Sequence, residues 1–309
     1  GNVVWVKRFG SSGNDKSRAL AVSPSGDCYV TGYYSGNTTF GNTQLTPSGN
    51  SDIFVVKINS SGNVLWAKKG AGNNEDRGYG IAFDKSGNVF VTGKYTGSAT
   101  FSGTTINSGG TAGSFLAKYD ANGNLQWVKS GGSNGNINES NCVAVDETGF
   151  IYTAGFFNGT ADYGSYHLTS AGSSDIVVAK YNQSGNVIWA KKAGGPYEDI
   201  ANGISIDTVT HLIYLTGQID DYGYFDSHYA GAAGNRDVFV AAYDMSGVSV
   251  WAKCYGGSQR DIGLAISADK RGNIFTTGIF SETANFGSYT LSGFPISDFF
   301  IDKVSPAPA

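Results

Sequence analysis

One short motif, a glycine followed by an apolar segment that contains tryptophan, occurs five times and constrains the fold of this chain most. The copies begin at Gly1, Gly62, Gly123, Gly185 and Gly247. Each contains one of the five tryptophans, and successive tryptophans lie 61, 61, 62 and 62 residues apart. A repeat of this length buries its own faces poorly, so we expect the copies to stack into a single body.

Each repeat contains four short stretches typical of β-strands, which are clearest in the second copy at 79–83, 88–93, 115–119 and 124–129. The links between paired stretches combine aspartate with glycine, which is the pattern of a hairpin turn. Glycine contributes 45 of the 309 residues, about twice its usual share, and this suits many tight turns. Four antiparallel strands in each of five repeats predict an all-β fold, a five-bladed β-propeller.

The two ends of the chain predict how the ring closes. Residues 1–8 contain the fourth strand of a repeat without the first three, and 298–304 read as a third strand without a fourth. We therefore expect residues 1–8 to complete the last blade, which leaves no open sheet edge. The expected single domain, 1–304, contains five blades, called repeats 1 to 5 below, at 17–68, 78–129, 140–191, 201–253, and 262–304 together with 1–8; residues 305–309 read as a linker stub.

Between the second and third strands, each repeat holds a short insert with an aromatic residue before a two-residue turn. We expect each insert to form a small hairpin on the face that also carries the loops between blades. The five inserts are 39–43, 100–104, 162–166, 224–228 and 285–289.

The repeat resembles the β-propeller repeat family (SBBP) through 51–57, 66–68, Asp76, 81–84 and 87–93. The resemblance covers nearly all of the chain. It implies a propeller in a secreted or cell-surface bacterial protein, because such repeats are common there. In Bacteroidetes they often precede a sorting domain for type IX secretion, and this chain shows neither such a domain nor a signal peptide. The family supplies no catalytic residues.

Two sets of repeated aspartates are interpreted as structural. A ring of carboxylates could bind a cation or a sugar, but repetition in most copies favours side chains that hold their own loops. The tryptophans, at one invariant position, are expected to pack between blades. The aspartates before the first strands are Asp15, Asp76, Asp199 and Asp261, and those before the third strands are Asp52, Asp175, Asp237 and Asp298.

Charge and motifs exclude several functions. The net charge of −4 and the absence of a basic stripe argue against nucleic-acid binding. No apolar run approaches the ~20 residues of a membrane span. The three cysteines show no metal-binding spacing, and no cofactor is expected. A Ca²⁺ site at Asp220, Asp221 and Asp226, the densest acidic cluster, is an alternative, although the spacing does not match an EF-hand.

No catalytic residues are expected. Some five-bladed propellers are glycoside hydrolases, which need two carboxyl groups roughly 5–10 Å apart in one pocket. The first strands offer no acid at the expected channel mouth. Glu139 and Glu198 are singular acids close by, but two candidates do not make a mechanism. A glycoside-active enzyme is therefore the least favoured alternative.

Positions that differ from repeat to repeat are not fixed by the fold, so they indicate a ligand surface better than repeated ones. A solvated rim without a ligand is the competing interpretation. At the expected channel mouth, polar and aromatic side chains suit contact with a glycan or a protein. The candidate ligand-binding residues are Arg18, Tyr33, Tyr79, Lys94, Asn141, Phe156, Asn202 and Gln218.

The sequence thus predicts a non-catalytic extracellular binding or adhesion module, a monomeric domain of a larger protein. It would engage a glycan or protein through the face with the small hairpins. A structural spacer between other domains is the alternative.

Overall fold

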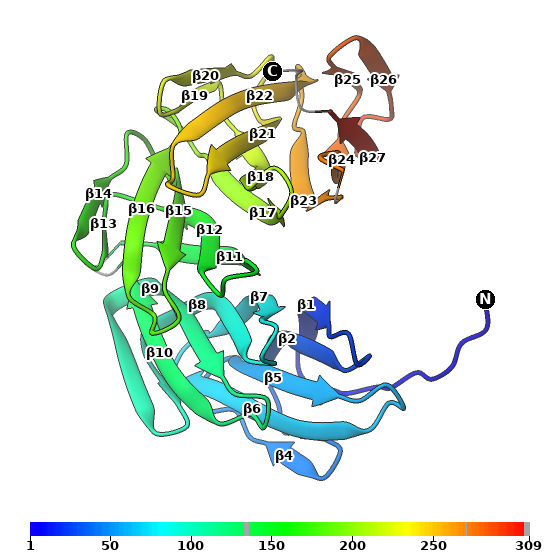
Figure 1. Cartoon of the computed structure of the whole chain (residues 1–309), viewed down its shortest axis with the longest axis vertical. Helices are drawn as coiled ribbons and strands as arrows, with labels where there is room; N and C mark the ends of the chain where they lie inside the picture. The colour runs from blue at the N-terminus through cyan, green and yellow to red at the C-terminus, as the bar shows by residue number, and fades with distance from the viewer. Residues whose placement is uncertain (133–135, 270, 306–309) are drawn as a thin grey trace. The chain divides into compact units, whose positions relative to one another are not determined.

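The computed structural model describes residues 1–132, 136–269 and 271–305 (Figure 1). All regular secondary structure in these ranges consists of β-strands, so the all-β prediction is confirmed. The chain divides into two compact units. Unit 1 comprises Gly1–Val145 with Gln183–Gly185, and unit 2 comprises Asp146–Asn182 with Asn186–Ala309. Most of the predicted linker stub, residues 306–309, lies outside the described residues.

In unit 1, repeats 1 and 2 each form four antiparallel strands, in the order β1-β2-β5-β6 and β7-β8-β9-β10. The end of β6 also pairs with β8, which joins the two sets into one sheet. The strands are β1 (Lys16–Val22), β2 (Cys28–Tyr34), β3 (Thr38–Phe40), β4 (Thr43–Leu45), β5 (Asp52–Ile58), β6 (Val64–Gly72), β7 (Arg77–Phe83), β8 (Val89–Phe101), β9 (Thr104–Tyr119), β10 (Leu125–Gly131) and β11 (Asn138–Val145).

Unit 2 repeats the pattern with the strand orders β12-β15-β16, β17-β18-β21-β22 and β23-β24-β27. Here β22 also pairs with β25, as β6 does with β8. The strands are β12 (Ile151–Phe157), β13 (Thr160–Tyr163), β14 (Tyr166–Thr169), β15 (Asp175–Tyr181), β16 (Val187–Ala193), β17 (Ile200–Asp207), β18 (Leu212–Ile219), β19 (Tyr222–Phe225), β20 (His228–Gly231), β21 (Asp237–Asp244), β22 (Ser249–Gly257), β23 (Ile262–Ala268), β24 (Ile274–Phe280), β25 (Thr283–Phe286), β26 (Tyr289–Ser292) and β27 (Asp298–Val304).

The small hairpins are confirmed in all five repeats, each with a two-residue turn. They are β3-β4, the tips of β8 and β9, β13-β14, β19-β20 and β25-β26. In repeat 2 the hairpin is continuous with the second and third strands, because β8 and β9 run through it with one register shift near Gly97.

The turns between strands have the aspartate and glycine geometry that their sequences predict. The Asp84 carboxylate accepts the N–H groups of Ser86 and Asn88, and Gly87 takes a left-handed backbone with φ of 79°. Repeat 4 lacks this glycine, and His211 takes the left-handed conformation instead, with φ of 53°. An aspartate side chain thus supplies the turn even where a non-glycine residue must bear the unfavourable φ.

The tryptophans join consecutive repeats, as predicted. Four indole N–H groups donate to a carbonyl in the turn that precedes the fourth strand of the following repeat. The pairs are Trp5 with Ser60 (3.0 Å), Trp66 with Ala121 (3.1 Å), Trp127 with Gln183 (3.0 Å) and Trp189 with Met245 (3.2 Å). This docking explains why Gln183–Gly185 is grouped with unit 1.

The core of unit 1 lies between the faces of neighbouring repeats. Ile53 and Val55 of repeat 1 are fully buried in one cluster with Phe115, Ala117 and Tyr119 of repeat 2. The alternate residues of the third strand, such as Phe54 and Val56, belong to a second cluster on the opposite face. A strand that contributes to two interfaces must be apolar on both sides.

The structure differs from the sequence prediction at the N-terminus. Residues 1–8 form no strand (Figure 1), and the sheet β23-β24-β27 has three strands where four are predicted. A strand exists only where a neighbour pairs with its backbone, and no described partner pairs with residues 1–8. The side chains of Val3, Val4 and Val6 are exposed.

Candidate functional site

Four predicted ligand-binding residues of unit 1 belong to a single cluster at the starts and ends of neighbouring strands. Arg18 comes from β1, Tyr33 from β2, Tyr79 from β7 and Lys94 from β8. We call these four, together with Glu75, Arg77 and Glu139, the charged-aromatic cluster.

Two arginine–tyrosine contacts cross from repeat 1 to repeat 2 in the charged-aromatic cluster. The Arg18 guanidinium lies 5.2 Å from the centre of the Tyr79 ring, and that of Arg77 lies 4.6 Å from the Tyr33 ring. Both separations are within the range of cation–π attraction. Arg18 is exposed, whereas Tyr33 is buried and supports Arg77 rather than presenting a surface of its own.

Two glutamates offset the positive charge of the cluster. Arg77 and Lys94 face each other across β7 and β8, an arrangement of like charges that is unfavourable by itself. Glu75 forms ion pairs with both, at 3.6 Å from Lys94, and Glu139 lies 3.1 Å from Lys94. The ion pairs fix four long side chains in one arrangement, and their charged groups remain partly accessible to a ligand.

Tyr79 stays a neutral phenol at physiological pH. Burial raises the pKa of its hydroxyl, and the nearby Glu139 carboxylate raises it further, while Lys94 and Arg77 act in the opposite direction. A neutral phenol both donates and accepts hydrogen bonds, so Tyr79 is suited to bind a hydroxyl or amide group.

Unit 2 contains three of the predicted residues, and two of them already have protein partners. Asn202 on β17 donates to the carbonyl oxygen of Gly263 at 2.9 Å, which ties repeat 4 to repeat 5. Gln218 on β18 is buried and its amide lies 3.3 Å from Glu198. Phe156 on β12 is half-buried. Asn141 lies in unit 1, half-buried on β11.

Sequence reasoning missed Glu75 and Arg77, although the same criterion finds them. The residue two places before each candidate on the first strand also varies among repeats, as Lys16, Arg77, Glu139, Ile200 and Ile262. The residue before the loop aspartate varies as well.

The repeated aspartates hold loops, as predicted. The Asp199 carboxylate accepts the N–H groups of Gly195 and Asp220, and Asp261 accepts those of Gly257 and Ser281. Among the described residues, no group of three or more His, Cys, Asp or Glu side chains is arranged to hold a metal ion. Of the acidic cluster weighed for Ca²⁺, Asp226 accepts the N–H of Ser249 and Asp220 faces Arg236 at 3.9 Å.

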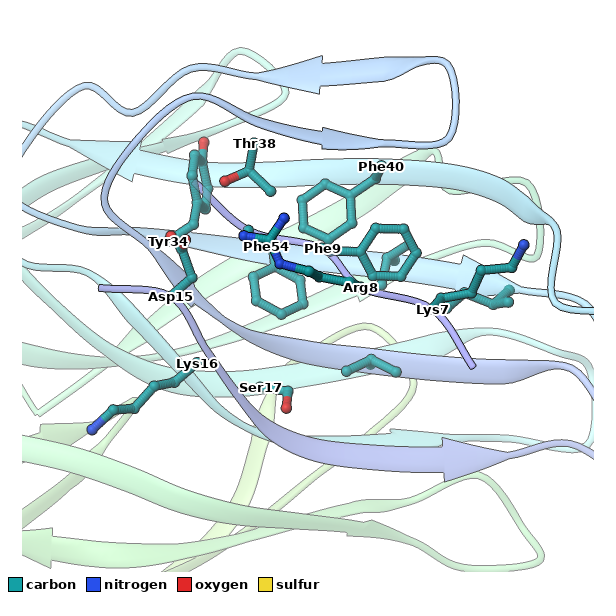
Figure 2. A pocket seen from close by; sticks show the side chains of 14 residues that line it. Lys7, Arg8, Phe9, Asp15, Lys16, Ser17, Tyr34, Thr38, Phe40 and Phe54 are labelled. Atoms are coloured by element: carbon teal, nitrogen blue, oxygen red, sulfur yellow. The ribbon is translucent and has the colours of Figure 1, made fainter. Parts of the chain in front are cut away.

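A pocket of about 380 Å³ opens on the other face of repeat 1 (Figure 2). Its floor is apolar, with Val30, Phe54, Val56 and Ile58, and Lys7 and Arg8 lie beside it. The residues of repeat 2 that correspond to this floor pack against repeat 1 in the core. The pocket thus lies on the face of repeat 1 that corresponds to a covered face of repeat 2, and it contains none of the predicted ligand-binding residues.

Comparisons with known proteins give partial matches. The chain is 26% identical over 241 residues, 66% of its length, to an uncharacterized WD repeat-containing protein L264 of Acanthamoeba polyphaga mimivirus. It is 27% identical over 168 residues, 52% of its length, to the regulatory protein FlaEY of Caulobacter vibrioides. The matched region is 17% of each relative.

A solved structure of the Dos1 propeller matches with a TM-score of 0.44 and 9% identity, covering 88% of this chain and 68% of that one. The described part of the chain contains no helix with the length and apolarity needed to cross a bilayer. Residues 70–98, which run from the end of β6 into β8, match the family described as β-propeller repeat. The chain thus contains a repeat of the SBBP β-propeller family, within an all-β, propeller-like fold.

Proposed function

We propose that this chain is a non-catalytic binding module of a secreted or cell-surface bacterial protein. Its ligand, a glycan or a protein, would contact the charged-aromatic cluster. The observation that carries this proposal is the cluster itself: Arg18, Tyr79 and Lys94 occupy positions that vary among the repeats, yet they come together with Arg77 and two glutamates. A fold that needed these contacts for stability would repeat them.

The environments of the two singular acids favour binding over catalysis. Glu139 pairs with Lys94 at 3.1 Å, and Glu198 pairs with Arg236 at 2.7 Å. A glycosidase needs two carboxyl groups that are free to act on one glycosidic bond. Each of these two carboxylates is instead engaged in an ion pair.

We further propose that the five repeats form five blades of a closed ring, with residues 1–8 as the fourth strand of repeat 5. In repeats 1 to 4, the aromatic of the second strand lies 6.1–6.2 Å from the tryptophan of the same repeat. Phe275 and Trp5 have no such ring partner among the described residues. Trp5 already docks on the turn of repeat 1, as Trp66, Trp127 and Trp189 dock on the following repeat.

Exposed apolar side chains also support closure. Ile53 and Val55 are fully buried under repeat 2, but the equivalent Phe299 and Ile301 of repeat 5 are 78% and 73% exposed. Leu20 on β1 is 62% exposed, whereas its equivalent Ile81 is buried. In a closed ring, the exposed apolar side chains of repeat 5 would pack against those of repeat 1. Removing this apolar surface from water would stabilise the fold.

The binding proposal is tested with labelled protein of the full 309 residues on two arrays, one of glycans and one of purified bacterial surface proteins. We expect a reproducible ligand whose binding falls about tenfold or more for the double variant Arg18→Ala, Tyr79→Ala, as for central interface residues. The control Thr100→Ala, Thr105→Ala removes an exposed pair on the hairpin of repeat 2 and should bind normally. Unchanged binding by the cluster variant, or no ligand on either array, contradicts the proposal and favours a spacer.

A further inference from the structure

The outward face of the β19-β20 hairpin differs from that of the other small hairpins. At the cross-strand pair that faces solvent, the other four repeats have polar side chains, and three of these pairs are hydrogen bonded. They are Thr39 with Gln44, Thr100 with Thr105 (2.9 Å), Asp162 with His167 (2.6 Å) and Asn285 with Thr290 (2.8 Å). In repeat 4 the pair is Tyr224 with Tyr229. Because the hairpin forms in four repeats without an aromatic at this cross-strand pair, its folding does not require Tyr224 and Tyr229.

Three tyrosines form a continuous aromatic surface, which we call the tyrosine platform. Tyr222 and Tyr229 stack with ring centres 6.1 Å apart, and Tyr224 meets Tyr229 edge-on at 5.5 Å. The side chains of Tyr224 and Tyr229 are 50% and 58% exposed. A Cβ atom at Gly231 would lie 2.7–3.0 Å from the hydroxyl and ring of Tyr229, so this ring lies across the glycine against the strand.

The hairpin beneath the tyrosine platform is anchored on both sides. On its inner face, Phe225 and Ala230 are buried. The backbone of Tyr224 exchanges two hydrogen bonds with Gly194. The Ser249 N–H donates to the Asp226 carboxylate, and the Ser249 hydroxyl lies 3.1 Å from Nδ1 of His228. A surface whose shape is fixed before binding loses little conformational entropy when a ligand arrives.

We infer that the tyrosine platform is a stacking site for a neutral carbohydrate. Aromatic faces suit the C–H surface of a pyranose ring, and phenol hydroxyls suit its hydroxyl groups. The exposed carboxylates Asp221 and Asp226 flank β19 and can accept hydrogen bonds from sugar hydroxyls, whereas they would repel an anionic sugar or a nucleic acid.

The inference names a ligand class for the proposed binding function and rests on it, but it concerns a surface separate from the charged-aromatic cluster. Affinity electrophoresis tests it, with the full chain run through gels containing hydroxyethylcellulose, xylan, galactomannan or amylopectin. The variant Tyr224→Thr, Tyr229→Thr recreates the Thr100–Thr105 pair of repeat 2, so its fold should be preserved. Circular dichroism and the thermal midpoint check this.

We expect at least one polysaccharide to retard the wild-type chain, and the variant to bind it about tenfold more weakly, as stacking on exposed aromatics predicts. Equal retardation of the two proteins, or no retardation of the wild-type chain by any of the four polysaccharides, overturns the inference. A polysaccharide whose binding is lost only in the variant Arg18→Ala, Tyr79→Ala overturns the tyrosine platform while it supports the proposed function.

Discussion

Within each unit, buried aspartate carboxyl groups accept hydrogen bonds from their own loops. The pKa values of these carboxyl groups determine how the stability of the fold depends on pH. Asp76, Asp199 and Asp237 are almost fully buried, and each lies near a second buried aspartate. Burial is the main cause that raises the pKa of each to about 7, and the neighbouring carboxylate raises it further. Backbone N–H groups act in the opposite direction without cancelling these effects.

We therefore predict that the free energy of unfolding decreases as pH rises from about 4 to about 7. The folded state holds these protons up to a pKa of about 7, whereas the unfolded chain loses them near pH 4. The stabilisation is complete below the unfolded pKa and is lost as pH rises through the folded value. Thermal unfolding between pH 5 and pH 8.5 should show a lower midpoint at the alkaline end.

The variant Asp76→Asn provides the control, because a neutral amide can keep the hydrogen bond that Oδ1 accepts from Thr96. Its midpoint should vary less with pH than that of the wild-type chain. A midpoint that rises with pH in the wild-type chain, or an equal slope in both proteins, would contradict the assignment of raised pKa values.

At the scale of elements, the contact of tryptophan with the next turn is the repeated connection between sheets. Gly247, in the turn before β22, has a φ of +83°, and a Cβ atom there would lie 2.8 Å from the Trp189 ring. Two independent requirements therefore select glycine at this position, one from the backbone and one from the approach of the ring.

We predict that Gly247→Ala lowers the free energy of unfolding by about 3 kcal/mol, the sum of a left-handed backbone cost and displacement of Trp189. Gly103 is the matched control, because its φ is +91° and nothing lies within 4 Å of its added Cβ. Gly103→Ala should cost only about 1–2 kcal/mol. Urea unfolding measures both, and equal losses would show that the tryptophan contact contributes nothing.

The strands, turns and hairpins could be predicted from sequence because each depends on local chemistry that recurs in five copies. Asp84 with Gly87, and the aromatic before each hairpin turn, specify their structures within a few residues. The charged-aromatic cluster was predicted in part: Arg18, Tyr33, Tyr79 and Lys94 were found, but Glu75 and Arg77 were not. Burial of Tyr33 and Gln218 could not be predicted, because it depends on contacts between repeats. The aromatic pair Tyr224 and Tyr229 differs from the other repeats in sequence but was not singled out.

At the scale of the whole molecule, the two ends of the chain each lack a partner that the other could supply. Residues 1–8 have the sequence of a fourth strand and form none, while β27 pairs only with β24 among the described strands. The exposed side chains of Phe299 and Ile301 are consistent with a missing partner strand next to β27.

Hydrogen exchange, measured by mass spectrometry on a monomer isolated by size exclusion with light scattering, tests closure most directly. A closed ring predicts slow exchange for the amides of residues 3–7 and 299–304, because both segments are then hydrogen bonded. Deletion of residues 1–8 should speed exchange of those amides of 299–304 that do not bond to β24, and leave the protection of β5 unchanged. Rapid exchange of residues 3–7 in the wild-type monomer, or protection found only in an oligomer, would contradict the closed ring.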